Sequence, residues 1–253
     1  MPDDVRARFA TVAQNYSRSA FHAGRQGLQE VVELAEPRPG DLALDVATGT
    51  GNAAFAMAEG GARVFGLDLT PEMLAEARRV AAERGVLSVD WVIGDAQTLP
   101  FAADSFDIYM VRAAPHHFPD LEQALREAAR VVKPGGRACF IDCAPPAAAR
   151  DVLHEVEVGR DPSHVLSRTV DEWTALLDSA GLVVERAQQR EVDWDHDGWM
   201  DNMAVPAEQR PTLARMVESS RGQALAQLHP ERREGKLWHA YWHCLIRARK
   251  PWS

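Results

Sequence analysis

Short apolar runs alternate with helix-length amphipathic segments over most of the chain, and this alternation limits the fold more than any other feature. Strands that alternate with helices form right-handed βαβ units, which build a parallel sheet covered by helices on both faces. We therefore expect an α/β three-layer sandwich. The apolar runs that predict the first five strands are 42–46, 62–67, 88–93, 106–111 and 137–143.

The segments between these runs carry residues that typically begin helices. Thr70 and Pro71 form an N-cap and first-turn pair, and Asp120 is placed to cap the helix after the fourth strand. Thr169 and Glu172 form a capping box before a further amphipathic helix. These signals indicate regular strand–helix units through most of the chain.

The last part of the chain departs from this repeat. Two more apolar runs predict a sixth strand and an antiparallel last strand, which gives a single domain with a seven-stranded, mostly parallel sheet. Leu213, Met216 and Val217 fall at helical intervals, so we expect their helix to pack on the rim of the sheet, where the insertion and the N-terminal helix would together form the acceptor site. A homodimer interface is the alternative. The expected parts are a helical N-terminal cover (1–40), the core (41–192), a helical lid insertion (193–236) and the last strand with the tail (237–253).

Charge and composition exclude several classes of partner. The net charge of −9 is unsuited to nucleic acid, whose phosphates require a basic surface. No apolar run approaches the ~20 residues of a membrane span, and the first residues lack a secretory pattern, so we expect a cytoplasmic protein. The three cysteines lie in apolar runs, where we expect buried, reduced thiols.

The segment 44–58, LDVATGTGNAAFAMA, joins the first strand to an alanine-rich helix. Gly49 and Gly51 allow a tight turn and a close approach of the backbone to a ligand. The N-terminus of the following helix offers free N–H groups to a carboxylate. The pattern G-x-G-x-x-A also matches a dinucleotide fingerprint, so by itself it does not identify the ligand.

Three aspartates at the ends of successive strands indicate which ligand the loop after the first strand binds. Asp68 can accept both hydroxyls of a ribose, Asp95 can accept the amino group of adenine, and Asp45 can hold an α-ammonium group. Each aspartate alone is also explained as a helix cap, but the ordered series is not. Ribose, adenine and an amino-acid group together fit S-adenosylmethionine better than a nicotinamide dinucleotide.

The same segments resemble a known family. Residues 44–58, VFGLDLTPEMLAEARRV, WVIGDAQTLPF, SFDIYMVRAAPHHFPD and LREAARVVKPGGRACFID are similar to the successive motifs of class I S-adenosylmethionine-dependent methyltransferases. The nearest group is that of the ubiquinone/menaquinone-biosynthesis (type 11) enzymes and their bacterial relatives, to which RDPSHV (160–165) adds a weaker similarity. This resemblance implies a Rossmann-like sheet. Ala47 is a departure, since many members have glycine there.

The resemblance also implies how the cofactor S-adenosylmethionine lies. Its methionine end meets the loop after the first strand and the end of the fourth, while its ribose and adenine meet the second and third strands. The N-terminal helix is implied to close over the methionine carboxylate. The residues implied in cofactor binding are Tyr16, Ser19, Asp45, Ala47, Gly49, Gly51, Asp68, Leu69, Met73, Asp95, Ala96, Arg112 and Ala113.

Two histidines follow the fourth strand, at the sheet edge where ligands of open α/β folds bind. A neutral imidazole there can take a proton from a hydroxyl or amine as the methyl group arrives. We name His117 as the catalytic candidate, ahead of His116, because histidine usually fills that position in similar proteins. The alternative is that the ring only packs, and that alignment of the reactants supplies the acceleration.

Two further patterns resemble parts of metal sites. The segment 193–198, DWDHDG, matches the first half of an EF-hand loop, but Ala204 stands where that loop needs a bidentate glutamate. On the last strand, alternation places His239 and His243 on the face opposite Cys244. We therefore expect no metal site.

The expected function is methyl transfer from S-adenosylmethionine to an O, N or C atom of a small organic acceptor, without a nucleic-acid or membrane partner. Two alternatives share the same motifs: a non-catalytic protein that binds this cofactor, and the same fold used for non-methylating chemistry. An NAD-dependent oxidoreductase is a weaker alternative, because the sequence lacks a second mononucleotide-binding half.

Overall fold

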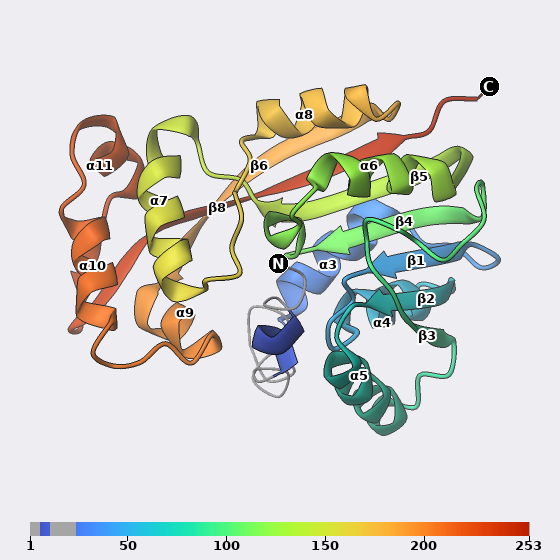
Figure 1. Cartoon of the computed structure of the whole chain (residues 1–253), viewed down its shortest axis with the longest axis horizontal. Helices are drawn as coiled ribbons and strands as arrows, with labels where there is room; N and C mark the ends of the chain where they lie inside the picture. Colours follow the sequence, from blue (N-terminus) through green and yellow to red (C-terminus); the bar gives the residue numbers. More distant parts are fainter. Residues whose placement is uncertain (1–5, 11–23, 253) are drawn as a thin grey trace.

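A twisted mixed sheet runs through the centre of the protein (Figure 1). The computed structural model describes residues 6–10 and 24–252, and all that follows concerns those residues. The strand order is β3-β2-β1-β4-β5-β8-β6, with β7 paired to β8. The strands are β1 (Leu42–Val46), β2 (Arg63–Asp68), β3 (Val89–Ile93), β4 (Phe106–Arg112), β5 (Val132–Cys143), β6 (Val183–Asp195), β7 (Glu231–Arg233) and β8 (Lys236–Arg249).

The strand directions confirm the expected Rossmann-like α/β fold. Strands β1 to β5 pair in parallel, whereas β8 is antiparallel to both β5 and β6. The short strand β7, which forms a hairpin with β8, has no counterpart in the sequence analysis. Because the parallel strands all end at the same edge of the sheet, the loops that follow them meet there.

Helices cover both faces of the sheet. On one face α3 (Arg25–Ala35), α4 (Asn52–Glu59) and α5 (Pro71–Arg84) bury their apolar sides. On the other face α6 (Leu121–Val131) and α8 (Val170–Ser179) pack against the sheet. The three layers are the ones that the alternation of strands and helices predicts.

The predicted helix starts are confirmed, with one difference in detail. Asp120 accepts the backbone N–H of Gln123 at 2.8 Å, and Thr169 forms a capping box with Glu172. Thr70 stands at the N-cap of α5, but its hydroxyl makes no capping bond there.

The remaining helices gather where β6 and β8 extend beyond the other strands (Figure 1). They are α7 (Ala147–Arg160), α9 (His196–Asn202), α10 (Arg210–Glu218) and α11 (Gly222–Leu228). The apolar face of α10, with Leu213 and Val217, packs into a cluster with Leu153 and Val156 of α7. This differs from the rim of the sheet that we expected, because α7 offers α10 an apolar face of its own.

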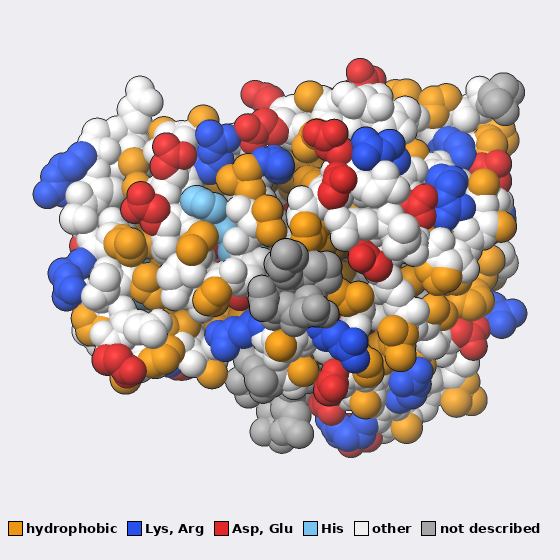
Figure 2. All heavy atoms as spheres, viewed as in Figure 1, with side chains coloured by type: hydrophobic (Ala, Val, Ile, Leu, Met, Phe, Trp, Pro, Cys, Tyr) orange, Lys and Arg blue, Asp and Glu red, His pale blue; other side chains and the backbone are white. Residues whose placement is uncertain are grey.

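The surface shows no segregation of charge on the face seen in Figure 2, where acidic and basic side chains are mixed. Cys139, Cys143 and Cys244 are buried free thiols, as expected. Among the described helices, none combines the length and apolarity that a membrane crossing requires.

Candidate active site

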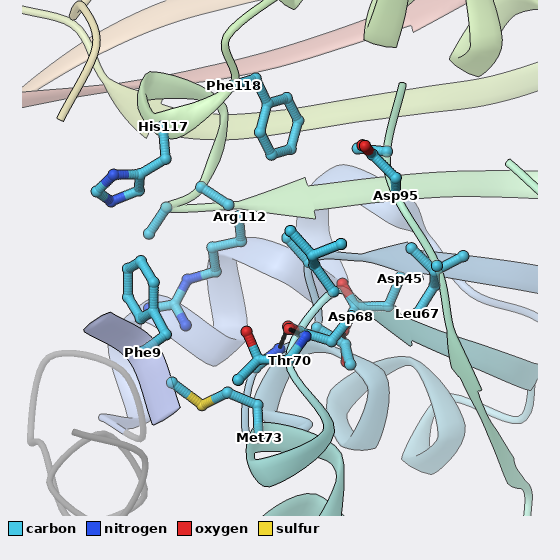
Figure 3. A pocket seen from close by; sticks show the side chains of 18 of the residues that line it. Phe9, Asp45, Leu67, Asp68, Thr70, Met73, Asp95, Arg112, His117 and Phe118 are labelled. Atoms are coloured by element: carbon cyan, nitrogen blue, oxygen red, sulfur yellow. Dashed lines mark hydrogen bonds between the residues drawn. The ribbon is translucent and has the colours of Figure 1, made fainter. Parts of the chain in front are cut away.

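A pocket lies at the carboxyl ends of β1 to β4, and we call it the strand-end pocket (Figure 3). It brings together residues that the sequence analysis predicted from four separate loops. Tyr16 and Ser19 lie outside the described residues. The predicted residues that line the strand-end pocket are Asp45, Ala47, Gly49, Asp68, Leu69, Met73, Asp95, Ala96, Arg112, Ala113 and His117.

The loop after β1 turns through left-handed backbone conformations. Gly49 has a φ of 55°, and a Cβ atom there would meet nothing within 4 Å, so this glycine leaves open space beside the pocket. Gly51 has a φ of 87°, but a Cβ atom there would lie 2.6 Å from Trp91 and 2.8 Å from Phe55. Gly51 is not among the residues that line the pocket, and it packs closely at the N-cap of α4.

Asp68 connects the loops after β1 and β2. Its Oδ2 atom accepts the N–H of Gly49 at 2.8 Å, and its Oδ1 atom accepts the N–H of Thr70 at 2.8 Å. Burial raises the pKa of this carboxyl above its ordinary value, although the hydrogen bonds from Thr70 and Gly49 oppose the rise. A ligand hydroxyl that donates to Asp68 would further stabilise its charged form.

Asp45 lines the strand-end pocket and is almost fully buried. The hydroxyl of Thr48 donates to its Oδ2 atom at 2.5 Å. Burial raises the pKa of Asp45 to about 7, against the lowering effects of Thr48 and of the Arg112 charge. An α-ammonium group placed here would restore full ionisation, because an opposite charge favours the carboxylate.

Asp95 is fixed by hydrogen bonds with its own loop. It accepts the backbone N–H of Gln97 at 2.8 Å, and the Gln97 side chain also donates to its carboxylate. The oxygen of the Gln97 amide in turn accepts the N–H of Asp120, which connects the loop after β3 to the start of α6. Asp95 is therefore held in place at the pocket wall.

Several further residues line the strand-end pocket that the sequence analysis did not name. Phe9 and Phe118 add aromatic surface, with Phe9 on the side opposite the carboxylates in Figure 3. Thr50 and Asn52 extend the loop after β1. The signal for Thr50 and Asn52 was their position beside the glycines, whereas nothing in the local pattern points to Phe9.

His117 lines the pocket, but its two ring nitrogens face a different loop. Nδ1 lies 3.1 Å from the carbonyl oxygen of Ser163, and Nε2 lies 3.9 Å from Oδ2 of Asp161. Burial, followed by the charge of His116, lowers the pKa of His117 to about 3, so the ring is neutral. Nδ1 is within hydrogen-bond distance of Ser163, whereas Nε2, at 3.9 Å from Asp161, makes no hydrogen bond with it, and a catalytic role of His117 stays a prediction.

A second cavity of about 280 Å³ lies next to the strand-end pocket. Arg112 and Ala113, at the end of β4, line both. Ala113 has a φ of 52°, a strained conformation for alanine that turns the chain sharply at this junction. The walls of the second cavity include Glu30 of α3 and Trp199 of α9.

His116 belongs to the second cavity and not to the strand-end pocket. It lies with His117 in the short 3-10 helix η1 (Pro115–His117). Its Nδ1 atom is 2.5 Å from Oδ1 of Asp142. Burial opposes protonation of His116, but the Asp142 carboxylate outweighs burial, and the pKa of His116 lies well above its ordinary value.

Cys143 completes a group of possible metal ligands with His116 and Asp142. One donor atom from each of the three side chains lies within 4.8 Å of the other two. The sequence analysis did not find this group, because the histidine and the other two residues come from different strand ends. Their spacing along the chain matches no known metal-binding motif.

Comparison with known proteins agrees with this architecture. A family model described as a methyltransferase domain matches residues 44–140. YcgJ of Bacillus subtilis, an uncharacterized methyltransferase, is 32% identical over 207 residues, covering 81% of this chain and 82% of YcgJ. The crystal structure of YcgJ aligns with a TM-score of 0.84 at 29% identity, covering 90% of this chain and 99% of that one. The chain belongs to the class I S-adenosylmethionine-dependent methyltransferases.

Two further similarities, one in sequence and one in fold, agree with this family assignment. UbiE of Cereibacter sphaeroides, a ubiquinone/menaquinone biosynthesis C-methyltransferase, is 42% identical over 115 residues, which cover 44% of this chain and 46% of UbiE. A phosphoethanolamine N-methyltransferase of Haemonchus contortus, solved with S-adenosylmethionine, has the same fold with a TM-score of 0.68 at 18% identity, covering 96% of this chain and 57% of that one. The methyltransferase is UbiE-like, and membership in the S-adenosylmethionine-dependent family gives its cofactor.

The patterns that resembled metal sites have structural roles in this methyltransferase. Asp195 caps α9, since its side chain accepts the N–H groups of Asp197 and Gly198. His239 lies 3.2 Å from the ring of His196, and Cys244 packs in the core on the other face of β8, as the alternation predicts.

Proposed function

We propose that this methyltransferase transfers the methyl group of S-adenosylmethionine, held in the strand-end pocket, to a small organic acceptor in the second cavity. The observation that carries this proposal is the wall that the two spaces share at Arg112 and Ala113. The methionine end of the cofactor is expected at the end of β4. Its sulfonium group would therefore face the second cavity across this junction.

The second cavity has the size and lining of a small-molecule site. Its volume of about 280 Å³ is close to the lower end of the range for ligand pockets, which is roughly 300–1,000 Å³. Trp194 and Tyr241 stack with ring centroids 5.2 Å apart, and Trp199 meets Tyr241 edge to face. These rings offer an apolar wall on which an organic acceptor can be held in one orientation.

Residues 24–30 and α9 contribute walls of the second cavity from two distant parts of the sequence. This placement supports the proposal that the N-terminal cover and the first helix of the insertion together enclose the acceptor. The helices α10 and α11 support that enclosure through α7 instead of covering the cavity themselves.

Methyl transfer from a sulfonium is an in-line displacement, so alignment across the junction supplies much of the acceleration. The acceptor also has to lose a proton if its attacking group is a hydroxyl, thiol or ammonium group. We assign this activation to the His116–Asp142 pair, because both residues line the second cavity and the Asp142 carboxylate can accept a proton.

The alternative of a non-catalytic cofactor-binding protein explains the strand-end pocket but not the second cavity. A protein that only senses S-adenosylmethionine has no need for buried ionisable groups beside the reactive end of the cofactor. The second cavity therefore favours an enzyme with an acceptor.

The test is release of S-adenosylhomocysteine with a panel of hydroxylated, thiol-containing and amine metabolites. Mass spectrometry should find a product that is heavier by one CH2 unit. Trp194→Ala should lower kcat/KM for that acceptor at least about tenfold while S-adenosylhomocysteine binding stays within twofold of wild type. Trp238→Ala is the matched control, because Trp238 lines neither space. Binding of the cofactor without turnover on any acceptor would contradict the proposal.

A further inference from the structure

Three side chains with different donor atoms meet on the wall of the second cavity. They are His116 of η1 and the last two residues of β5, Asp142 and Cys143, and all three are buried. Their nitrogen, oxygen and sulfur atoms lie within 4.8 Å of one another. We propose that these three residues bind one divalent ion of the zinc type, with an open coordination position toward the second cavity.

The donor set selects the class of ion. Imidazole nitrogen and thiolate sulfur suit Zn²⁺, Co²⁺ or Fe²⁺, whereas Mg²⁺ and Ca²⁺ prefer shells made of oxygen. Three protein ligands with a fourth, exchangeable position are typical of zinc sites that take part in catalysis. A neutral imidazole, a carboxylate and a thiolate together balance the two charges of the ion, which matters in a buried site.

The surrounding backbone holds the three residues in place. The carbonyl oxygen of His116 accepts the N–H groups of Val165 and Leu166 at 2.8 and 3.2 Å. Asp142 and Cys143 are paired with β8 in the sheet ladder. Ligands fixed in this way lose little freedom when an ion binds, which favours a defined site over an adventitious one.

Hydrogen bonds connect the same donor atoms in the structure. His116 and Asp142 share the 2.5 Å contact, and the thiol of Cys143 lies 2.8 Å from the hydroxyl of Ser167. Binding of the ion displaces protons from these contacts, as is general for cysteine- and histidine-containing sites. The side chains need only small rotations, because the donor atoms already face one another.

Such an ion would determine the class of acceptor, and this step rests on the proposed function. An acceptor hydroxyl or thiol bound at the open position loses its proton to solvent more readily, as water does on zinc. The lone pair of that oxygen or sulfur then forms the bond to the methyl carbon. The bond between the methyl carbon and the cofactor sulfur breaks, its electron pair stays on sulfur, and S-adenosylhomocysteine leaves. The acceptors are therefore alcohols, phenols or thiols.

The test uses the full-length protein, freed of metal with a chelator and titrated with ZnCl2 or CoCl2 alone. We expect one ion per chain. Cobalt should give visible bands of a four-coordinate site together with a near-ultraviolet thiolate-to-cobalt band, which Cys143→Ser should abolish. His116→Gln and Asp142→Asn should weaken zinc binding at least about tenfold. Cys139→Ser is the matched control, since this buried thiol of the same strand donates to the carbonyl oxygen of Leu34 and should leave binding unchanged.

Two outcomes would overturn the metal site: no stoichiometric binding, or binding that the three ligand substitutions leave unchanged. In either case the three residues serve proton transfer alone. S-adenosylhomocysteine titration of each variant separates this failure from misfolding and from failure of the proposed function. None of the three residues lines the strand-end pocket, so folded variants should keep their cofactor affinity within twofold.

Discussion

Asp68 and Gly49 are joined by a hydrogen bond of 2.8 Å, from the backbone N–H of the glycine to Oδ2 of the carboxylate. The residue that ends β2 thereby holds the loop that follows β1. Because each carboxylate oxygen can accept more than one hydrogen bond, Asp68 can bind a ribose hydroxyl without releasing Gly49. The Asp68 side chain thus fixes the loop after β1 and can also accept a hydrogen bond from the cofactor.

Asp68→Ala should weaken binding of S-adenosylhomocysteine at least ~10-fold and up to several hundred-fold. Two charge-assisted hydrogen bonds to the ribose are lost, at roughly 1.5–3 kcal/mol each before water compensates. Isothermal titration calorimetry measures the change. Asp90→Ala is the control, because Asp90 is exposed on β3 and pairs with Arg63. An affinity of Asp68→Ala within twofold of wild type would reduce Asp68 to a residue that only fixes the loops.

His117→Gln should change turnover by less than about tenfold once an acceptor is known. Nδ1 of His117 is within hydrogen-bond distance of Ser163, and Nε2 lies 3.9 Å from Asp161 in the same loop, which favours a packing role for the ring. Loss of a general base typically costs about 10²–10⁴-fold. A fall of that size in kcat, with cofactor affinity retained, would restore His117 as the catalytic residue that the sequence suggested.

Ala47→Gly should raise the free energy of unfolding by about 0.5–1 kcal/mol. Ala47 has a φ of 53°, where an L-residue with a Cβ is strained by about 1–2 kcal/mol and glycine is not, while the greater freedom of glycine in the unfolded chain offsets part of the gain. Urea denaturation measures the change. Ala75→Gly, at an exposed position inside α5, should do the opposite and cost about 1 kcal/mol. Destabilisation by both substitutions would show that the Ala47 methyl group contributes more through packing than it costs in strain.

Stability should fall in acid partly through His196. Burial, and then the neighbouring His239, lower the pKa of His196 to about 3, against roughly 6.5 in the unfolded chain. Above about pH 6.5 the ring is neutral in the folded and the unfolded state, so its titration does not change the free energy of unfolding. As the pH falls through 6.5 toward the folded value, only the unfolded state takes up the proton, so the free energy of unfolding decreases.

The His196→Gln variant measures this contribution. Between pH 7 and pH 5, wild type should lose on the order of 2 kcal/mol more unfolding free energy than His196→Gln. Denaturant curves at several pH values give the difference, in which the contributions of other groups cancel. Equal slopes for wild type and His196→Gln would mean that His196 charges freely in the folded state.

The carboxylates that line the strand-end pocket could be predicted from the sequence because they follow directly from strand order, while their contacts with the cofactor stay predictions. Asp45, Asp68 and Asp95 lie at or directly after the ends of parallel strands, and parallel strands end at one edge of a sheet. The residue types at those ends then determine which ligand groups can bind. The close packing of Gly51 against Trp91, forty residues later, could not be predicted from the local pattern, and a contact of Gly51 with the cofactor stays a prediction.

The sequence predicted an acceptor site between the N-terminal helix and the insertion, but not the residues that line the second cavity, because the packing of their elements is set by long-range contacts. The direction of the His117 ring depends on Ser163, and the group of His116 with Cys143 depends on the pairing of β4 with β5, which brings the ends of these two strands together. No local period or spacing encodes these contacts. The packing partner of α10 likewise could not be predicted, because an apolar helix face indicates that the helix packs against another element but not against which one.

The contact between α7 and α10 provides a test of that packing through Gly159 and Leu213. A Cβ atom at Gly159 would lie 2.5 Å from a methyl carbon of Leu213, so Gly159→Ala alone should be destabilising by about 1 kcal/mol despite the better helix propensity of alanine. Leu213→Ala alone should lower the free energy of unfolding by about 2–5 kcal/mol, because Leu213 is buried. Combined with Leu213→Ala, the Gly159→Ala change should instead stabilise by about 1 kcal/mol, since the clash is gone and the helix gain remains.

The double-mutant cycle should therefore show a coupling energy on the order of 2 kcal/mol, measured by urea denaturation of the four proteins. S-adenosylhomocysteine affinity should stay within twofold in all of them, because neither residue lines the strand-end pocket. Additive effects would mean that α10 does not rest on α7. The insertion would then be free to cover the sheet edge, and its apolar face would belong to the acceptor site instead of to the support behind it.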